Sequence, residues 1–209
     1  MSNLTVKELG VSSPYLNDVY YLYKERFGQA WGEVSRCRDG FSPLPVGSLC
    51  TNCNQIRTDA YPPEETLEYI RSELSQPGTV AVLGLLDQLV SFAWGYQSTP
   101  QEIVKKKWQD YPESQQQIVD SLKPYIGQYE SLFYISECVT RKGFEKMGYQ
   151  RQLVEYLSLN KDSQLQLLVR TLEQSSMARI CTGFLNLTLV REYVDPDRSD
   201  RVLFVSPKN

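Results

Sequence analysis

One stretch of the chain, residues 131–184, limits the possible folds more than any other. An apolar strand is expected at 131–139, and a basic, glycine-bearing loop follows at 140–148. A helix, a second strand at 164–171 and a short polar helix that ends on a Gly-Phe pair complete the pattern. This order places backbone N–H groups and several cations between two strands, an arrangement that suits a phosphate-bearing cofactor.

The composition indicates a chain that can build one domain with a sizeable core. Of its 209 residues, 41% are hydrophobic and 22% are charged. The formal net charge of −3 and the pI of about 5.2 give no basic excess, so no nucleic-acid partner is expected. No apolar run approaches the roughly 20 residues of a membrane span, and the N-terminus lacks the basic-then-apolar pattern of a signal peptide. We therefore expect a cytoplasmic protein with no membrane partner.

The chain contains no histidine, which excludes many catalytic and metal sites. Ser-His pairs, Cys-His pairs and histidine metal ligands are ruled out, so a general base must be Asp, Glu, Tyr, Lys, Cys or a relayed water. The five cysteines occur without a secretory signal, which indicates reduced thiols and not a disulfide framework.

Hydrophobic periodicity and turn residues predict the order of elements. The expected strands are 4–9, 79–86, 89–97, 131–139, 164–171, 183–193 and 201–205. The expected helices are 14–27, 62–74, 100–108, 112–122, the helix after the basic loop and the short helix that ends at 183. We also expect a long irregular loop at about 28–63, with one short helix at 30–37, and a helical insertion at about 100–124. The fold class is α/β (α+β): a single domain, 1–209, with a mixed sheet of about six or seven strands and helices on both faces.

Two motifs in the opening stretch resemble those of the GNAT acetyltransferase superfamily. In that family a strand ends in an apolar residue, here Val139, and a loop of the form R-x-x-G-x-G/A opens the next helix. The sequence EKMGYQ matches this loop with Glu145, Gly148 and Gln150, of which the glycine is retained. The second motif, SSMARICTGF, ends on the family's Gly-Phe pair. The order of elements over most of the chain also resembles that family, so a GNAT fold is expected.

The resemblance implies that acetyl-CoA is the cosubstrate and that backbone N–H groups of the loop bind the pyrophosphate of coenzyme A. The predicted cofactor-binding residues are Val139, Arg141, Lys142, Lys146, Gly148, Tyr149, Gln150 and Arg151. The helix that follows is expected to bury Met147, Leu153, Val154 and Leu157.

Physical chemistry also favours an anion at this loop. Helix N-termini carry unsatisfied N–H groups and the positive end of a dipole, and four cations lie nearby. Glu145 opposes an anion, so we expect only the backbone of Glu145 to face the phosphates. The alternative is an ordinary strand-loop-helix connection with a basic surface.

Acyl transfer to an amine needs a base, and donors for the carbonyl oxygen as it gains charge. Glu137 is the one carboxylate inside strand 131–139, and alternation places it on the same face as Phe133 and Ile135. We predict that Glu137 is the base; the alternative is a structural carboxylate bonded to neighbouring backbone. The resemblance assigns the stabilisation of the oxygen to the backbone N–H near Val139.

In the family a tyrosine in the second motif often protonates the leaving thiolate, and this chain lacks it. Arg179 stands four residues before Gly183, with Cys181 and Ser176 close by. Cys181 is the candidate replacement, because a thiol of pKa about 8.5 can donate a proton near neutral pH. The alternative, which the sequence favours, is that Cys181 is a small buried residue.

Three cysteines invite a zinc interpretation. Cys50 and Cys53 have the C-x-x-C spacing of a zinc site, and Cys37 lies upstream. Structural zinc takes four ligands, and without histidine the set is one ligand short. An ordinary reduced loop is therefore favoured, and no metal is expected.

Three aromatic residues are candidates for the acceptor pocket: Trp31, Trp94 and Tyr96. The family places its first helix and the following loop over that pocket; the alternative role of these side chains is core packing.

Two functional hypotheses of different classes follow. The first is an N-acyltransferase, in which an amine attacks acetyl-CoA directly. The second is a catalytically silent GNAT domain that binds coenzyme A or a protein partner, which the missing tyrosine and the altered loop motivate. The sequence leaves the acceptor amine and the oligomeric state open, with a homodimer among the expectations.

Overall fold

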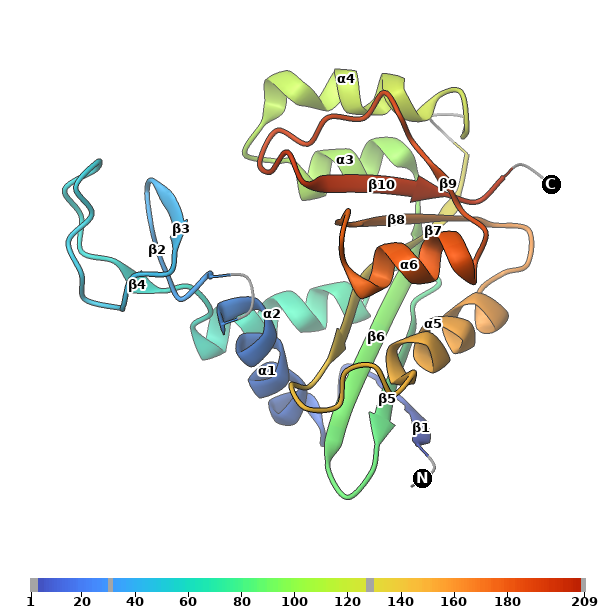
Figure 1. Cartoon of the computed structure of the whole chain (residues 1–209), viewed down its shortest axis with the longest axis horizontal. Coiled ribbons are helices and arrows are strands. Elements are labelled where there is room, and N and C mark those ends of the chain that lie inside the picture. The colour runs from blue at the N-terminus through green and yellow to red at the C-terminus, as the bar shows by residue number, and fades with distance from the viewer. Residues whose placement is uncertain (1–3, 30–31, 127–129, 208–209) are drawn as a thin grey trace. The chain divides into compact units, whose positions relative to one another are not determined.

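The structure, a computed structural model of the chain, describes residues 4–29, 32–126 and 130–207. Within these residues the main sheet has seven strands in the order β1-β5-β6-β7-β8-β10-β9, and a second sheet has three strands in the order β3-β2-β4. The predicted mixed sheet of six or seven strands is confirmed (Figure 1). No helix in this described part of the chain is long and apolar enough to cross a membrane.

The elements have the following bounds. The main sheet contains β1 (Thr5–Glu8), β5 (Val80–Leu85), β6 (Leu89–Ser98), β7 (Leu132–Thr140), β8 (Gln166–Leu172), β9 (Thr188–Leu189) and β10 (Arg201–Val205). The small sheet contains β2 (Ser35–Cys37), β3 (Gly40–Ser42) and β4 (Thr58–Asp59). The helices are α1 (Leu16–Lys24), continued by the π-helical turn η1 (Glu25–Gln29), and α2 (Pro63–Leu74), α3 (Pro100–Lys107), α4 (Pro112–Leu122), α5 (Tyr149–Asn160) and α6 (Ser176–Gly183).

Local sequence explains where α2 and α3 begin. Pro63 stands in the first turn of α2 together with Glu64 and Glu65, where a missing N–H costs nothing and negative charge meets the positive helix end. At α3, the backbone N–H of Glu102 donates to Thr99 Oγ1 at 3.3 Å, and the backbone N–H of Thr99 donates to the Glu102 carboxylate at 3.2 Å. This reciprocal capping box satisfies two donors that the helix leaves unpaired. Both helices confirm the sequence prediction.

Two predicted elements are wrong. The short helix expected at 30–37 is replaced at Ser35–Cys37 by β2, whose backbone pairs with both β3 and β4; residues 30 and 31 lie outside the described part of the chain. The strand expected at 183–193 shrinks to β9, whereas the preceding helix ends at Gly183 as predicted. The N–H groups of Phe184 and Leu185 then donate to the carbonyl of Ile180 at 3.0 Å, so the chain completes a helical turn where a strand was expected.

The described chain divides into two compact units. The first contains Met1–Ser75, Val82–Phe92 and Val139–Leu153, and the second contains Gln76–Ala81, Ala93–Cys138 and Val154–Asn209. The single domain expected for 1–209, with its long loop and its helical insertion, stays a prediction, and the two helices expected at 100–108 and 112–122 are present as α3 and α4.

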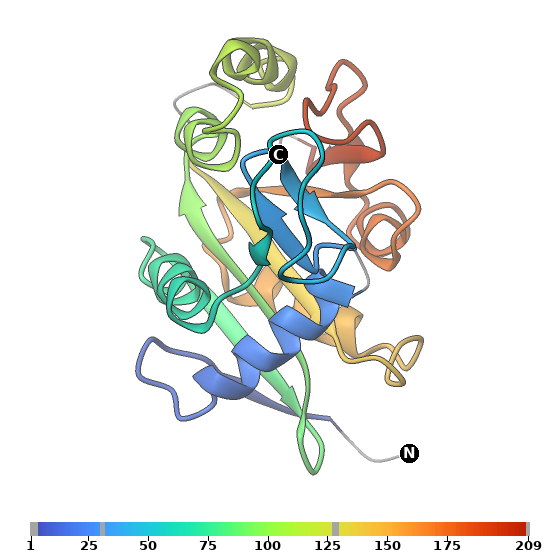
Figure 2. The same cartoon turned by 90° about the vertical axis from the view of Figure 1, so that its left-hand side faces the viewer.

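In the first unit, α1 and α2 lie side by side (Figure 2). The ring of Tyr23 on α1 stacks at 6.4 Å from that of Phe92 and meets the edges of Tyr61 and Tyr69 at 5.6 and 6.1 Å. The aromatic run of the first helix therefore contributes to the core, which large aromatic side chains stabilise through their buried area.

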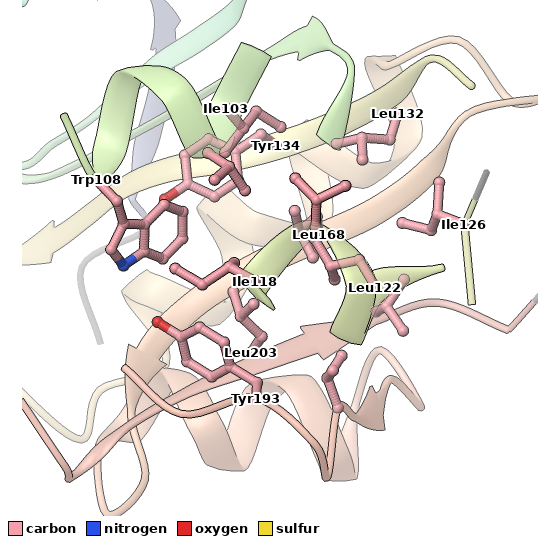
Figure 3. Close-up of a cluster of buried hydrophobic side chains, with 14 of the residues drawn as sticks. Ile103, Trp108, Ile118, Leu122, Ile126, Leu132, Tyr134, Leu168, Tyr193 and Leu203 are labelled. Carbon is pink, nitrogen blue, oxygen red and sulfur yellow. The ribbon is translucent and has the colours of Figure 1, made fainter. Parts of the chain in front are cut away.

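In the second unit, α3 and α4 cover an apolar cluster (Figure 3). Each member has at most 8% of its surface exposed. Most of the members come from these two helices and from strands of the main sheet. Members labelled in Figure 3 include Ile103, Trp108, Ile118, Leu122, Tyr134, Leu168, Tyr193 and Leu203. A continuous core of this kind is the main source of stability in a small domain.

Also in the second unit, β7 and β8 pair in parallel and then part. Their registered pairs run from Leu132↔Gln166 to Ile135↔Val169. Both strands continue past the last pair, and β8 ends only at Leu172. The backbone of β7 after Ile135 therefore leaves its pairing with β8, which makes its peptide groups available to other partners.

Candidate functional site

The end of β7 is fixed within the first unit by hydrogen bonds to β6. Ser91 is fully buried, and its Oγ donates to the carbonyl of Val139 at 2.6 Å and lies 3.0 Å from Thr140 Oγ1. The backbone N–H of Arg141 donates to the carbonyl of Val90 at 2.8 Å. These bonds set the point at which the strand ends and the basic loop begins.

The carboxylate of Glu145 folds back onto that loop. Its Oε2 accepts from the backbone N–H of Gly143 at 2.5 Å, and its Oε1 accepts from Arg26 NH1 at 2.9 Å. The backbone N–H of Glu145 itself, followed by the N–H of Gly143 and the charge of Arg26, holds the pKa of this carboxyl below its usual range. The sequence analysis expected only the backbone of Glu145 to face the phosphates; the structure places the side chain against the same N–H groups.

A second carboxylate meets the loop from η1. The backbone N–H of Lys142 donates to Glu25 Oε1 at 3.3 Å. Together with Gly143 and Glu145, three N–H groups of one short loop point at negative charge. Such concave groups of main-chain N–H donors are recurrent anion sites.

Glycine at 148 is required by backbone conformation and not by space. Gly148 has a φ of +81°, and a Cβ added there would meet nothing within 4 Å. Its carbonyl accepts from the N–H of Gln152 at 3.0 Å, which closes the first turn of α5. Lys146 also adopts a positive φ, of 65°, so the loop is bent sharply before the helix. The predicted loop-to-helix junction is therefore present.

The helix buries most of the side chains that were expected to pack. Leu153, Val154 and Leu157 have no exposed surface, as predicted. Met147 was also expected to be buried, but it lies in the loop before α5 and is 57% exposed. The correction follows from the helix beginning at Tyr149, because helical spacing applies only within the helix.

The predicted cofactor-binding side chains fall into two groups. Lys142, Lys146 and Arg151 are exposed, which leaves their charges at the surface beside the loop and the first turn of α5. Tyr149 is buried and Gln150 is half-buried. Exposed cations near a ring of N–H groups add long-range attraction for an anion.

Arg141 differs from these cations. Its NH1 donates to Gln88 Oε1 at 3.4 Å, at the turn between β5 and β6. There it helps to line a pocket of about 620 Å³ within the first unit, together with Lys7, Tyr15 and Asp18. Its guanidinium is therefore engaged with the β5–β6 turn, and only its backbone belongs to the loop described above.

The second unit holds the predicted base. Glu137 is half-buried on β7, two residues after the last pair with β8 at Ile135. Its neighbour Ser136 accepts from Lys107 Nζ at 2.9 Å, and the same ammonium lies 5.6 Å from the ring centre of Tyr134. Lys107 and Tyr134 meet the face of β7 that carries Ser136, whereas alternation places Glu137 on the opposite face, on the part of β7 that no longer pairs with β8.

Cys181 lies deep in the second unit. Its side chain has no exposed surface, and its carbonyl accepts from the N–H of Leu187 at 2.8 Å. Burial raises the pKa of the Cys181 thiol to about 12. These properties agree with the alternative role as a small buried residue and make proton donation difficult.

The acceptor-pocket candidates on β6 are in the core. Trp94 is 0% exposed and Tyr96 is 1% exposed. The Tyr96 ring packs edge-on against Tyr134 at 5.8 Å, and Lys106 Nζ lies 5.0 Å from the Tyr96 ring centre. Trp31, the third candidate, lies outside the described residues.

Three residues at the loop were not identified from the sequence: Glu25, Arg26 and Ser91. Arg26 and Glu145 are separated by 119 positions, so no local spacing could have predicted their contact. The short distance between the three cysteines was also missed. The sulfur atoms of Cys37, Cys50 and Cys53 lie within 4.8 Å of one another and form a group of three candidate metal ligands among the described residues.

The sequence matches no family model and no curated protein. The structure is similar to Arabidopsis thaliana NAA60 in complex with acetyl-CoA, with a TM-score of 0.54, 11% identity and 97% of each chain covered. It is also similar to the Drosophila melanogaster polyamine N acetyltransferase that forms N acetylagmatine, with a TM-score of 0.57, 10% identity and 97% and 99% of the two chains covered. A third similar structure is an acetyltransferase of the GNAT family from Staphylococcus aureus Mu50, with a TM-score of 0.53, 9% identity and 98% of each chain covered. At these identities the similarity establishes the fold.

Proposed function

We propose that this chain, whose fold is that of the GNAT acetyltransferases, transfers an acetyl group from acetyl-CoA to an amine. The solved structures that it resembles include an enzyme in complex with acetyl-CoA and a polyamine N acetyltransferase. Because fold does not determine activity, the proposal depends on the site.

The observation that carries the proposal is the anion-binding loop after β7. Backbone N–H groups of Lys142, Gly143 and Glu145 point at carboxylates, and Lys146 and Arg151 place positive charge nearby. A diphosphate offers the same negative oxygens with more charge, so it can replace the carboxylates at these donors. We assign the pyrophosphate of coenzyme A to this position.

The proposed reaction is a direct attack of the amine nitrogen on the thioester carbonyl. Glu137, or a water bound to it, takes the proton that the attacking ammonium must lose. Main-chain N–H near Val139 stabilises the oxygen as it gains charge. The new N–C bond forms, the C–S bond breaks, and coenzyme A leaves as a thiolate that is protonated.

Cys181 is a weak candidate for that last proton. With a pKa of about 12 its thiol is a weaker acid than an ordinary cysteine of about 8.5. Its side chain is also without exposed surface, so we propose a packing role for it and solvent as the proton source. Trp94 and Tyr96, whose side chains on β6 are buried, are also proposed to pack in the core and not to bind the acceptor.

A specific observation keeps the catalytically silent domain as the second candidate. Arg179 replaces the expected tyrosine, and the nearby Cys181 is buried. If solvent does not replace the missing side-chain donor, the domain would bind coenzyme A without turnover.

Thiol release from acetyl-CoA with a broad panel of amines separates the two candidates. Turnover supports the transferase, whereas calorimetric binding without turnover over the whole panel supports the silent domain. Within the first outcome, Glu137→Gln is expected to lower kcat at least about tenfold, because general base catalysis contributes about two to four orders of magnitude. Glu113→Gln, which changes an exposed carboxylate on α4, is the matched control. Equal kcat in the two variants would remove Glu137 from the mechanism.

A further inference from the structure

The small sheet β3-β2-β4 brings three cysteines to one point. Cys37 ends β2, and Cys50 and Cys53 come from the loop that follows β3. The three sulfur atoms lie within 4.8 Å of one another, and those of Cys53 and Cys37 are 3.5 Å apart. Around tetrahedral zinc, with Zn–S bonds of about 2.3 Å, sulfur atoms are about 3.8 Å apart. The sulfur positions therefore need to move by only about an ångström to share one ion.

The turn that carries Cys50 and Cys53 is closed by its own backbone. The N–H of Asn54 donates to the carbonyl of Cys50, and the N–H of Cys50 donates to the carbonyl of Gln55, both at 2.9 Å. These two bonds close the turn and hold its two cysteines on one short stretch of backbone.

A carboxylate is placed to provide the fourth ligand. Asp39 Oδ2 lies 3.8 Å from Cys50 Sγ and accepts from Asn52 Nδ2 at 2.7 Å. With a Zn–O bond of about 2.0–2.2 Å, oxygen and sulfur ligands of one tetrahedral ion are about 3.5 Å apart. Three cysteines leave the set one ligand short. Asp39 lies outside the group of three sulfur atoms within 4.8 Å of one another, so its exposed side chain must turn toward Cys37 and Cys53 to complete the set.

A buried arginine supports an anionic centre at this position. Arg57 is 7% exposed, and its NH2 donates to Cys50 Sγ at 3.2 Å while its NH1 donates to the carbonyl of Gly40 at 3.3 Å. Among the described residues its buried Nε has no hydrogen-bond partner. A buried cation is stable only beside compensating negative charge. Three thiolates and one carboxylate exceed the charge of Zn²⁺ by two, and Arg57 balances half of that excess.

The segment around the cysteines has little apolar core of its own. We call residues 33–61 the cysteine lobe; its buried side chains are Ser35, Ser42, Cys50, Arg57 and Ala60. Its larger apolar side chains are exposed: Val34, Phe41, Leu44, Val46, Leu49 and Ile56. Segments this short that bury so little apolar surface usually depend on a metal or a disulfide.

We propose that Cys37, Cys50, Cys53 and Asp39 bind one zinc ion that stabilises the cysteine lobe. All four coordination positions come from the protein, which is the arrangement of structural zinc and not of catalytic zinc. Binding releases the thiol protons and links metal affinity to the folding of the lobe. A disulfide between Cys37 and Cys53 would use two of the sulfur atoms. It would not explain why the buried Arg57 donates to the sulfur of Cys50.

The test uses the full chain purified with a reductant and without added chelator. Elemental analysis is expected to find about one zinc per chain, and replacement by Co²⁺ is expected to give the absorption of tetrahedral thiolate coordination. Cys53→Ser should abolish both signals. Cys138→Ser, which changes a half-buried cysteine on β7, should retain both and is the matched control.

The proposal is overturned if the reduced chain binds no zinc in competition with a micromolar-affinity chelator, or if Cys53→Ser leaves the Co²⁺ spectrum unchanged. It is also overturned if mass spectrometry of metal-free protein finds Cys37 and Cys53 joined in a disulfide after purification without reductant. Asp39→Ala is expected to weaken zinc binding at least about tenfold. An unchanged affinity in that variant would remove Asp39 from the ligand set. Acetyl-CoA turnover is measured separately, so either proposal can fail without the other.

Discussion

A buried arginine in one unit and a partly buried arginine in the other show how differently the two units hold charge. Arg170 in the second unit meets a carboxylate, Asp195, at 2.6 Å, and its guanidinium lies 4.6 Å from the ring centre of Trp108 in a large apolar core. Arg57 in the first unit meets the sulfur of Cys50 in a lobe with few buried apolar groups. The first site is complete with the residues that it has. In the second site no carboxylate pairs directly with the arginine, and three sulfur atoms lie close together. We therefore propose that a zinc ion binds these sulfur atoms.

The largest expected effect is at the complete site. Asp195 accepts from Arg170 Nε at 2.7 Å, from the hydroxyl of Tyr193, and from the N–H groups of Asp197 and Arg198 at 3.0 and 3.1 Å. Asp195→Ala removes the nearer carboxylate from the partly buried Arg170 and leaves Asp197 at 4.0 Å, so the free energy of unfolding is expected to fall by about 3 kcal/mol. Urea denaturation measures this loss.

The matched control is Asp120→Ala, which removes an exposed carboxylate that pairs with Lys123 on α4. Exposed pairs contribute about 0–1 kcal/mol. A similarly small loss for Asp195→Ala would mean that the contact between Arg170 and Asp195 contributes little to the stability of the folded chain.

The next largest effect is expected when zinc is removed, which tests the proposed site in the cysteine lobe. Chelation of zinc is expected to raise the rate of proteolytic cleavage within the cysteine lobe at least about tenfold, because metal binding and folding of a small site are linked. Residues of the second-unit core should keep their hydrogen-exchange protection. Loss of protection at Leu168 and Leu203 on chelation would contradict the view that the two sites are stabilised independently.

Acid is expected to weaken the carboxylate site in a defined direction. Burial alone would raise the pKa of Asp195, but the charge of Arg170 and the hydrogen bonds from Tyr193 and Arg198 outweigh it and lower that pKa. A carboxyl group with a lower pKa in the folded state contributes stability above its unfolded pKa of about 3.9. That contribution is lost as the pH falls through the folded pKa. Urea midpoints of the wild type and Asp195→Asn should therefore converge below about pH 3.9; a constant gap would contradict the assignment.

The smallest effect concerns the partly exposed ion pair between Arg26 and Glu145. The side chains of Arg26 and Glu145 are 25% and 40% exposed, so their pair contributes little to stability. Glu145→Gln instead removes a negative charge that competes with phosphate at Gly143, and coenzyme A is expected to bind several-fold more tightly, by about 1 kcal/mol. Calorimetric titration measures the change, with Glu155→Gln on α5 as the control. Weaker binding in Glu145→Gln would show that the carboxylate supports the ligand.

The parts of the fold that depend on local pattern were predictable from the sequence. The apolar alternation of 131–139, the glycine at 148 and the prolines and glutamates that begin α2 each specify an element through neighbouring residues. The short strands were not predictable. β2 and β4 have three and two residues, and their pairing with each other joins segments that are far apart in the sequence.

The same limit applies to the sites. The basic loop could be identified from its cations and Gly148, but the return of the Glu145 carboxylate to the loop depends on Arg26, far away in the sequence. The C-x-x-C spacing was visible, whereas the contacts of Asp39 with Cys50 and of Cys37 with Cys53 join positions 11 and 16 apart in the sequence. The spacing of residues in the sequence identifies candidate ligands that lie on one turn. It does not identify ligands that the folded chain brings together from separate segments.

The central claim is that backbone N–H groups of the loop after β7 bind the pyrophosphate of coenzyme A. Amide resonances of an isotope-labelled chain, followed during titration with coenzyme A, test it directly. The account predicts saturable shifts at Lys142, Gly143 and Glu145 that exceed those of the β5–β6 turn at Gln88. Saturation elsewhere in the chain, with these three amides unchanged, would contradict the account.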